Sequence, residues 1–189
     1  MMAVVPASSL KGRLLVAAPG LVDPNFDRTV VLLLSHGEEG ALGVVLNRPS
    51  GVDVLDPLPA WSRLVATPSV VFVGGPVQQD AVIGLGQARG EPLADLWTEV
   101  SGRVGVIDLS RDPDEVGGHL DEVRLFSGYA GWDQGQLEGE IDAGGWFVVD
   151  AEPEDALSRE PDGLWRRVLA RQPGQLALYA NYPADPSNN

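Results

Sequence analysis

The sequence contains no cysteine, which excludes disulfides, thiolate nucleophiles and cysteine-based zinc sites. The lack of disulfides fits a reducing compartment, and we expect a cytoplasmic location. Histidine is nearly as scarce, since His36 and His119 are the only two and neither has a second histidine at metal-ligand spacing. We therefore predict no metal site and no cofactor.

Long hydrophobic runs are also missing. The early apolar run from Leu14 to Ala18 is shorter than the core of a secretory signal, and no later stretch reaches the length of a membrane-spanning helix. We expect no targeting segment and no membrane partner.

Basic residues are few, and Lys11 is the single lysine. Lys and Arg number 13 against 27 Asp and Glu, which gives a net charge of −14. Nonspecific nucleic-acid affinity depends on clustered bases that displace counterions, and the closest basic pair here is Arg166 and Arg167. We predict no direct contact with nucleic acid and no attraction to anionic membranes.

The residues that are present indicate one packed domain. A chain of 189 residues with 44% hydrophobic residues supplies enough apolar side chains for one core. No internal repeat or low-complexity linker divides it. We predict a single α+β domain over residues 1–189, with a flexible, polar, proline-broken tail at 183–189.

Short apolar runs bounded by turn residues predict strands at residues 13–18, 29–35, 43–46, 70–73, 82–85, 103–107, 122–126 and 145–149. The first two lack polar alternation, so we expect them to be buried on both faces. We expect the run at 82–85 to pair with 70–73 as a hairpin through a tight turn at Gly74-Gly75-Pro76.

Two helices follow from their end signals. Residues 161–171 place Leu164, Trp165, Val168 and Leu169 on one stripe, which predicts a helix packed on the sheet. A weaker helix runs through Ile141 and opens at a capping-box pattern formed by Asp133 and Gln136.

Three blocks of sequence resemble the AlgH/YqgE family. They are LKGRLLVAAPGLVDPNFDRTVVLLLSHGEEGALGVVLNRP at 10–49, GGPV at 74–77 and GYAGWDQGQLEGEI at 128–141. They follow the family's order and spacing, so the resemblance spans about residues 10–169. It implies an α+β fold with a curved, partly closed mixed sheet flanked by helices, and no established biochemical activity. Many relatives have a histidine where this chain has Gly86-Gln87, which leaves an acid–base role there unsupported.

The family includes members labelled transcriptional regulators. This sequence contains neither a helix-turn-helix pattern nor a basic patch that would support direct DNA contact.

The turn Asn47-Arg48-Pro49 is the first candidate site. Arg48 at a strand end is suited to bidentate binding of a carboxylate or phosphate, with the Asn47 amide beside it. The simpler interpretation, which we favour, is that Asn47 and Pro49 make the turn while Arg48 pairs with an acid. Asp23, Phe26 and Arg28 form a second candidate surface, in which Asp23 is typical of an Asx turn.

Two further candidates carry chemistry. Gly74, Gly75 and Pro76 are suited either to presenting bare amides to an anion or, as we favour, to forming a tight turn. His36 ends a predicted strand beside Glu38 and Glu39, which suits a general base or an ordinary solvated histidine.

The block around Tyr129 and Trp132 leaves two interpretations open. The rings form one wall of a cleft, with Gln136 and Glu138 adding polar groups, or they fill core space.

Two functional hypotheses follow, and neither assigns a catalytic residue. The first, which we favour, is a non-catalytic regulatory protein that binds an unidentified protein partner or small ligand. It uses the loops at 19–28, 47–49, 74–77 and 128–136 as one surface. The second is an enzyme for a small anionic substrate held by Arg28 or Arg48, with His36 or Glu138 as acid or base.

Overall fold

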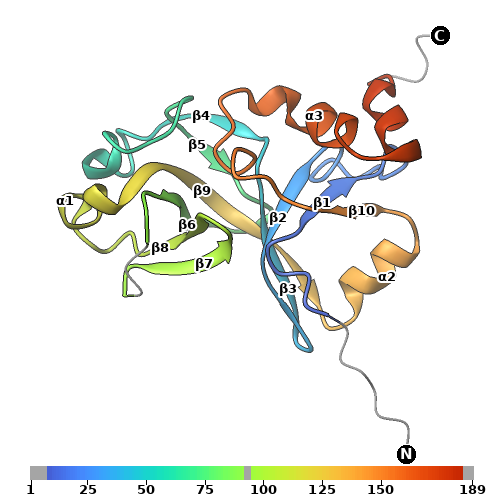
Figure 1. The fold of residues 1–189 in the computed structure, drawn as a ribbon, viewed down its shortest axis with the longest axis horizontal. Helices are drawn as coiled ribbons and strands as arrows, with labels where there is room; N and C mark the ends of the chain where they lie inside the picture. Colours follow the sequence, from blue (N-terminus) through green and yellow to red (C-terminus); the bar gives the residue numbers. More distant parts are fainter. Residues whose placement is uncertain (1–7, 92–94, 185–189) are drawn as a thin grey trace, which may run out of the picture.

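The computed structural model describes residues 8–91 and 95–184, which form a curved mixed sheet with short helices on its faces (Figure 1). In this described part the strands are β1 Leu14–Ala17, β2 Val30–Gly37, β3 Gly40–Val45, β4 Pro49–Asp53, β5 Val70–Val73, β6 Val77–Ala88, β7 Trp97–Ser101, β8 Val104–Ile107, β9 Leu120–Asp133 and β10 Trp146–Val149. The strand order is β10-β1-β2-β3-β9-β6-β8-β7, with β4 and β5 branching from β9. The predicted α+β class is confirmed.

The helices are short and lie between or after the strands. They are η1 Pro59–Trp61, α1 Pro113–Val116, η2 Gly117–His119, α2 Gln136–Asp142, η3 Pro161–Gly163, α3 Leu164–Ala170 and η4 Gly174–Asn181. No helix in residues 8–91 and 95–184 is long and apolar enough to cross a membrane.

Strand β9 joins the two halves of the sheet, because different stretches of it pair with different partners (Figure 1). Its last residues pair with β3, from Ala130 to Asp133. Its earlier residues pair with β6 on one side and with the parallel strand β5 on the other. The change of partner falls near Gly128, whose φ of 71° few other residues adopt.

Strand β1 and residues 30–34 of β2 are buried on both faces, as predicted, whereas the last three residues of β2 are not. Alternate side chains, such as Leu14 and Leu32, belong to a core that also contains Trp165 and Val168 of α3. Their neighbours on the other face, such as Leu15 and Val31, pack in a second core with Leu137 of α2. Each fully buried leucine contributes about 1.5–3 kcal/mol relative to an exposed one. The two-sided burial therefore fixes this half of the sheet between α2 and α3.

A third core fills the curved half of the sheet formed by β5, β6, β8 and β9. It includes Trp61, Trp97, Ile107 and Leu125.

The predicted hairpin between 70–73 and 82–85 is wrong. Strand β5 pairs with β4 and β9, while β6 pairs with β8 and β9. Gly74 and Gly75 carry the chain across β9 instead of turning it back. A Cβ on Gly74 would lie 2.3 Å from the Gly128 carbonyl oxygen, and one on Gly75 would lie 2.1 Å from the Tyr129 carbonyl carbon. Only glycine permits this crossing of two backbones.

The helix predictions are confirmed with small shifts. Half of the capping box forms, because the Gln136 side chain accepts a hydrogen bond of 3.0 Å from the Asp133 backbone N–H and α2 begins at Gln136. The helix predicted at 161–171 is a 3-10 turn followed by α3. Of the predicted flexible tail, residues 185–189 lie outside the described residues.

Candidate functional site

The side-chain amide of Asn47 hydrogen-bonds to the backbone at the start of β2. Its Nδ2 donates to the Arg28 carbonyl oxygen at 2.9 Å, and its Oδ1 accepts from the Val30 N–H at 3.0 Å. Because both the donor and the acceptor of the amide are used, Asn47 positions the end of the 19–28 loop against the sheet.

Among the described residues Arg48 pairs with no acid, contrary to the interpretation favoured from sequence. Its guanidinium donates to the carbonyl oxygens of Pro24 at 3.1 Å and Asp27 at 2.9 Å. In the same loop, Asp23 Oδ1 accepts from the Asn25 N–H at 2.8 Å, which is the predicted Asx turn. The arginine therefore stabilises the loop and has fewer donors available for an anion.

Arg28 fixes the C-terminal segment. Its Nη2 donates to the Tyr182 carbonyl oxygen at 2.7 Å, and its Cζ lies 4.6 Å from the centre of the Trp165 ring. The second contact is a cation–π interaction. Arg28 also has a φ of 53°, a conformation that few non-glycine residues adopt.

The glycines at 74 and 75 do not form an open anion cradle. The Gly74 N–H donates to the Ser127 carbonyl oxygen at 2.8 Å, and its carbonyl accepts from the Val45 N–H at 2.8 Å. Pro76 has no N–H to offer. Tyr129 packs, partly buried, against the core beneath α3.

His36 makes two polar contacts that define its tautomer. Nδ1 accepts from the Leu10 backbone N–H at 3.0 Å, so the ring proton lies on Nε2, which donates to Glu138 Oε1 at 2.8 Å. The pKa of Glu138 is lowered by its own backbone N–H and then by His36. Sequence reasoning proposed both residues but not their pairing, since His36 was expected to lie beside Glu38 and Glu39.

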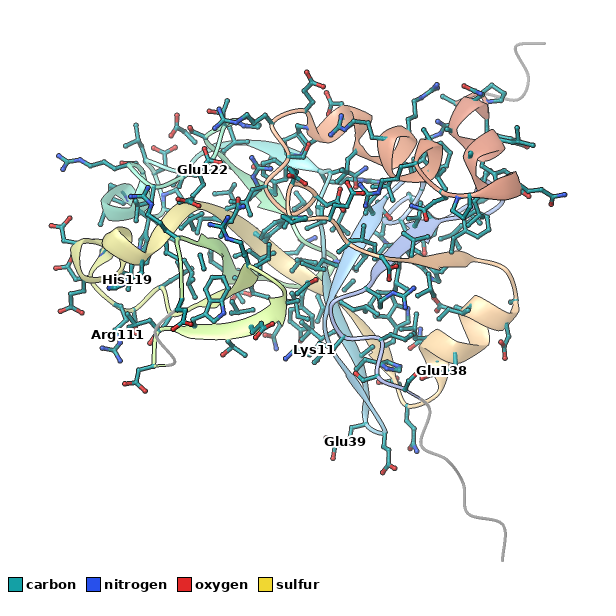
Figure 2. All side chains as sticks on the ribbon, in the orientation of Figure 1. Lys11, Glu39, Arg111, His119, Glu122 and Glu138 are labelled. Carbon is teal, nitrogen blue, oxygen red and sulfur yellow. The ribbon has the colours of Figure 1, made fainter. Side chains whose placement is uncertain are left out.

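This pair lies at the opposite end of β2 from Arg28. The strand has 8 residues, so the two ends are separated by roughly 25 Å at about 3.3 Å per residue. In Figure 2 Glu138 projects from α2 near the hairpin tip that carries Glu39.

Trp132 belongs to an aromatic cluster whose two indole N–H groups are bound by Glu140. Its ring contacts Phe26 and Trp146 at centroid distances of 6.2 and 6.0 Å. The indole N–H groups of Trp132 and Trp146 both donate to Glu140 Oε2 at 2.9 Å, and Gln136 donates to Oε1 at 3.0 Å. Trp132 is only 6% exposed, so for this ring the core interpretation is supported.

Each of the predicted strand-end loops contacts the next one. Arg48 holds the 19–28 loop, its carbonyl accepts from the Val73 N–H, and the chain at Gly74 and Gly75 touches Gly128 and Tyr129. The role of these loops as a recognition surface stays a prediction.

Two hollows lie elsewhere, and none of the residues proposed from sequence line them. The larger is an open cleft of about 870 Å³ between the segment at 152–160, α3 and the ends of β6 and β9 near Gln87 and Glu122. The smaller is an apolar cavity of about 100 Å³ with Leu14, Leu32 and Leu46 among its lining residues. Both hollows are lined by Glu152 and Asp155, so they are adjacent.

Each arginine that lines the cleft forms an ion pair with a carboxylate. Arg159 lies 2.6 Å from Glu122, and Arg171 lies 2.6 Å from Asp155. Arg167 approaches Glu160 at 3.6 Å. The hydrogen bonds from Asp155 raise the pKa of the Arg171 guanidinium above its ordinary value. These pairs fix the segment that forms the cleft wall.

One buried arginine ties that wall to the sheet. Arg124 of β9 has no exposed surface and donates to the carbonyl oxygens of Ser158 at 2.7 Å and Thr67 at 2.8 Å. Its Cζ lies 4.2 Å from the centre of the Phe72 ring. Burial lowers the pKa of Arg124 to about 10. Sequence reasoning missed this residue, whose only signal is an arginine flanked by the apolar residues Val123 and Leu125.

Comparison with known proteins places the chain in a family. The AlgH-like family model matches residues 14–177. The chain belongs to the AlgH-like family. Its relatives include UPF0301 proteins of Streptomyces coelicolor, 52% identical with both chains fully covered, and of Mycobacterium avium, 45% identical over 94% of this chain and 90% of the relative.

Two solved structures share the fold. A Corynebacterium diphtheriae protein solved by X-ray crystallography matches with a TM-score of 0.87 and 35% identity, covering 96% of this chain and 95% of that one. The solution structure of the AlgH protein from Pseudomonas aeruginosa matches with a TM-score of 0.69 and 30% identity, covering 97% and 100%. The family assignment made from three sequence blocks is therefore confirmed. No biochemical activity comes with it.

Proposed function

We propose that this AlgH-like protein is a non-catalytic binding protein that acts in the cytoplasm and holds a ligand or partner in the cleft beside the segment at 152–160. The observation that carries the proposal is the adjacency of the open cleft and the apolar cavity through Glu152 and Asp155. Ligand sites are typically concave, with apolar surface and a few convergent polar groups. The strand-end loops are a second, weaker candidate surface.

The contacts of the two candidate arginines argue against the enzyme hypothesis. Arg28 and Arg48 donate to backbone carbonyl oxygens that close the 19–28 loop and hold the C-terminal segment. An anionic substrate would have to compete with these bonds. His36 lies at the other end of β2 from Arg28, so the two cannot act on one small molecule.

The charge distribution supports regulation without direct DNA contact. The net charge is −14, and the arginines that line the cleft are each paired with a carboxylate. Phosphate binding would require these pairs to open.

A thermal-shift screen of metabolites and short peptides tests the proposal. A ligand at a hundred times its Kd adds about 2.7 kcal/mol of stability, which raises Tm by roughly 5–10 °C for a chain of this size. The shift should be lost in Ala151→Leu, which fills the apolar cavity, and kept in Ala143→Leu on the exposed end of α2. Turnover of a hit compound, or salt-resistant binding of a DNA duplex in a gel shift, would contradict the proposal.

A further inference from the structure

We propose that the occupant of the cleft is a basic peptide segment of a partner protein, carrying an apolar side chain that enters the neighbouring cavity. This inference rests on the proposed function and names the class of partner.

The charge left free in the cleft is negative. Its arginines are each engaged by a carboxylate, as described above for Arg159, Arg167 and Arg171. Among the described residues, Glu154 lines the cleft in an exposed position and makes no ion pair. The side chain of Glu160 is 85% exposed, with its arginine 3.6 Å away. A cationic ligand gains attraction at Glu154 without breaking an existing pair, whereas an anionic ligand must break one to reach an arginine.

Glu152 extends the negative charge of the cleft to the apolar cavity, because it lines both hollows. Its side chain is 57% exposed, and its oxygen lies 3.3 Å from Arg171, a looser contact than the 2.6 Å between Arg171 and Asp155. Glu152 lines both the cleft and the cavity. A positive group placed at Glu152 therefore lies beside the cavity.

The cavity itself suits a small apolar side chain. Leu14, Leu32 and Leu46 line it and are at most 1% exposed. Its volume of about 100 Å³ is somewhat smaller than the roughly 150 Å³ of an engineered apolar cavity that binds benzene. An aliphatic side chain placed there gains about 25 cal/mol for each Å² of apolar surface removed from water.

A peptide satisfies both features with one chain. Successive side chains of an extended peptide alternate in direction at about 3.3 Å per residue, so a leucine in the cavity places its neighbours toward the walls of the cleft. Basic neighbours then meet Glu152 and Glu154. Residues 1–7 and 185–189 contain no Lys or Arg, so these two segments do not match the proposed occupant.

The test measures binding of defined peptides to the full chain by isothermal titration calorimetry. The probe is acetyl-RRLRR-amide, with acetyl-EELEE-amide as the charge control and acetyl-RRGRR-amide as the anchor control. We expect saturable binding of the probe below about 1 mM and weaker binding of both controls. Binding of the probe should also weaken as the salt concentration is raised, because interactions between exposed charges are screened beyond roughly 10 Å at 0.1 M salt.

Variants locate the interaction. Glu154→Arg should weaken binding of the probe by about 3–10-fold, because reversal replaces an exposed attraction by a repulsion. Glu39→Arg makes the same change at the distant tip of the β2–β3 hairpin and should leave the affinity unchanged (Figure 2). Ala151→Leu should abolish the preference for the leucine peptide over the glycine peptide. Unchanged Tm values would show that each variant is folded.

Three results would overturn the inference. They are equal binding of the acidic and basic peptides, equal effects of Glu154→Arg and Glu39→Arg, and no binding of the probe by the folded chain. The peptide test can fail while a metabolite from the screen binds the unaltered chain and does not bind Ala151→Leu. In that case the proposed function stands and only the class of partner is wrong.

Discussion

Arg124 donates a hydrogen bond of 2.7 Å to the carbonyl oxygen of Ser158 from a side chain with no exposed surface. The bond joins the middle of the sheet to the segment that walls the cleft. Arg124 also donates to Thr67 and stacks on Phe72, yet among the described residues its Nε has no hydrogen-bond partner. Burying a cation that has only neutral hydrogen-bond acceptors costs free energy. We therefore infer that Arg124 is buried here because it holds the Ser158 segment against the sheet.

Replacing Arg124 should loosen the cleft wall. In Arg124→Met the carbonyl oxygens of Ser158 and Thr67 lose their buried donor, at about 1–3 kcal/mol each, partly offset by removal of a buried charge. We expect the free energy of unfolding in urea to fall by about 2–4 kcal/mol. Arg111→Met, which removes an exposed pair with Asp108 at 3.8 Å, should change it by less than about 0.5 kcal/mol. Equal stability of the two variants would show that Arg124 does not hold the segment.

Glu140 should determine how the two tryptophans of the aromatic cluster are held. In Glu140→Ala both indole N–H groups lose their acceptor, and we expect a loss of about 1–3 kcal/mol in unfolding free energy, with a change in tryptophan fluorescence. Glu140→Gln keeps one carbonyl oxygen and should lose less. An alanine variant as stable as the unaltered chain would contradict this role.

The stability of the protein should depend on Glu138 in acid. Its pKa is lowered in the folded chain by its backbone N–H and by His36, so its contribution is complete above the ordinary value of 4.5 and is lost as pH falls through the folded-state pKa. The difference in unfolding free energy between the unaltered chain and Glu138→Gln should therefore be constant from about pH 5 upward. It should shrink below that, and a difference that grows in acid would reverse the assigned sign.

Gly75 should tolerate no side chain. A Cβ there would lie 2.1 Å from the backbone of Tyr129, so Gly75→Ala should separate two strands and reduce the unfolding free energy by more than about 3 kcal/mol. Gly139→Ala in α2 meets nothing within 4 Å and should stabilise the helix by about 1 kcal/mol. Thermal denaturation measures both, and opposite signs are expected. A fully stable Gly75→Ala would mean that the crossing is looser than described.

The strands that the sequence predicts well are those whose signal is local. Residues 14–17 and 30–34 are apolar on both faces, and each run is buried on both faces as expected. Strands β4 and β7 were missed, because PSGVD and WTEVS carry exposed polar residues and are held by pairing with neighbours. The extension of β9 beyond Phe126 was also missed, because its glycine-containing end is held by pairing with β3 and β6.

Local turn chemistry was predictable, and the cleft was not. The Asx turn at Asp23 depends on two neighbouring residues and was foreseen. The carbonyl contacts of Arg48, the pairing of His36 with Glu138 and the burial of Arg124 depend on segments far apart in the chain. The cleft combines residues 87, 122 and 152–171, which no single run of sequence reveals.

The most direct test of the account is backbone amide NMR of the full chain titrated with a compound that raises its Tm. Binding in the cleft predicts chemical-shift changes centred on Glu152, Ser158 and Arg171, with the amides of Asn47 and Arg48 unchanged. Changes centred on Asn47 and Arg48, with the cleft amides unmoved, would contradict the central claim.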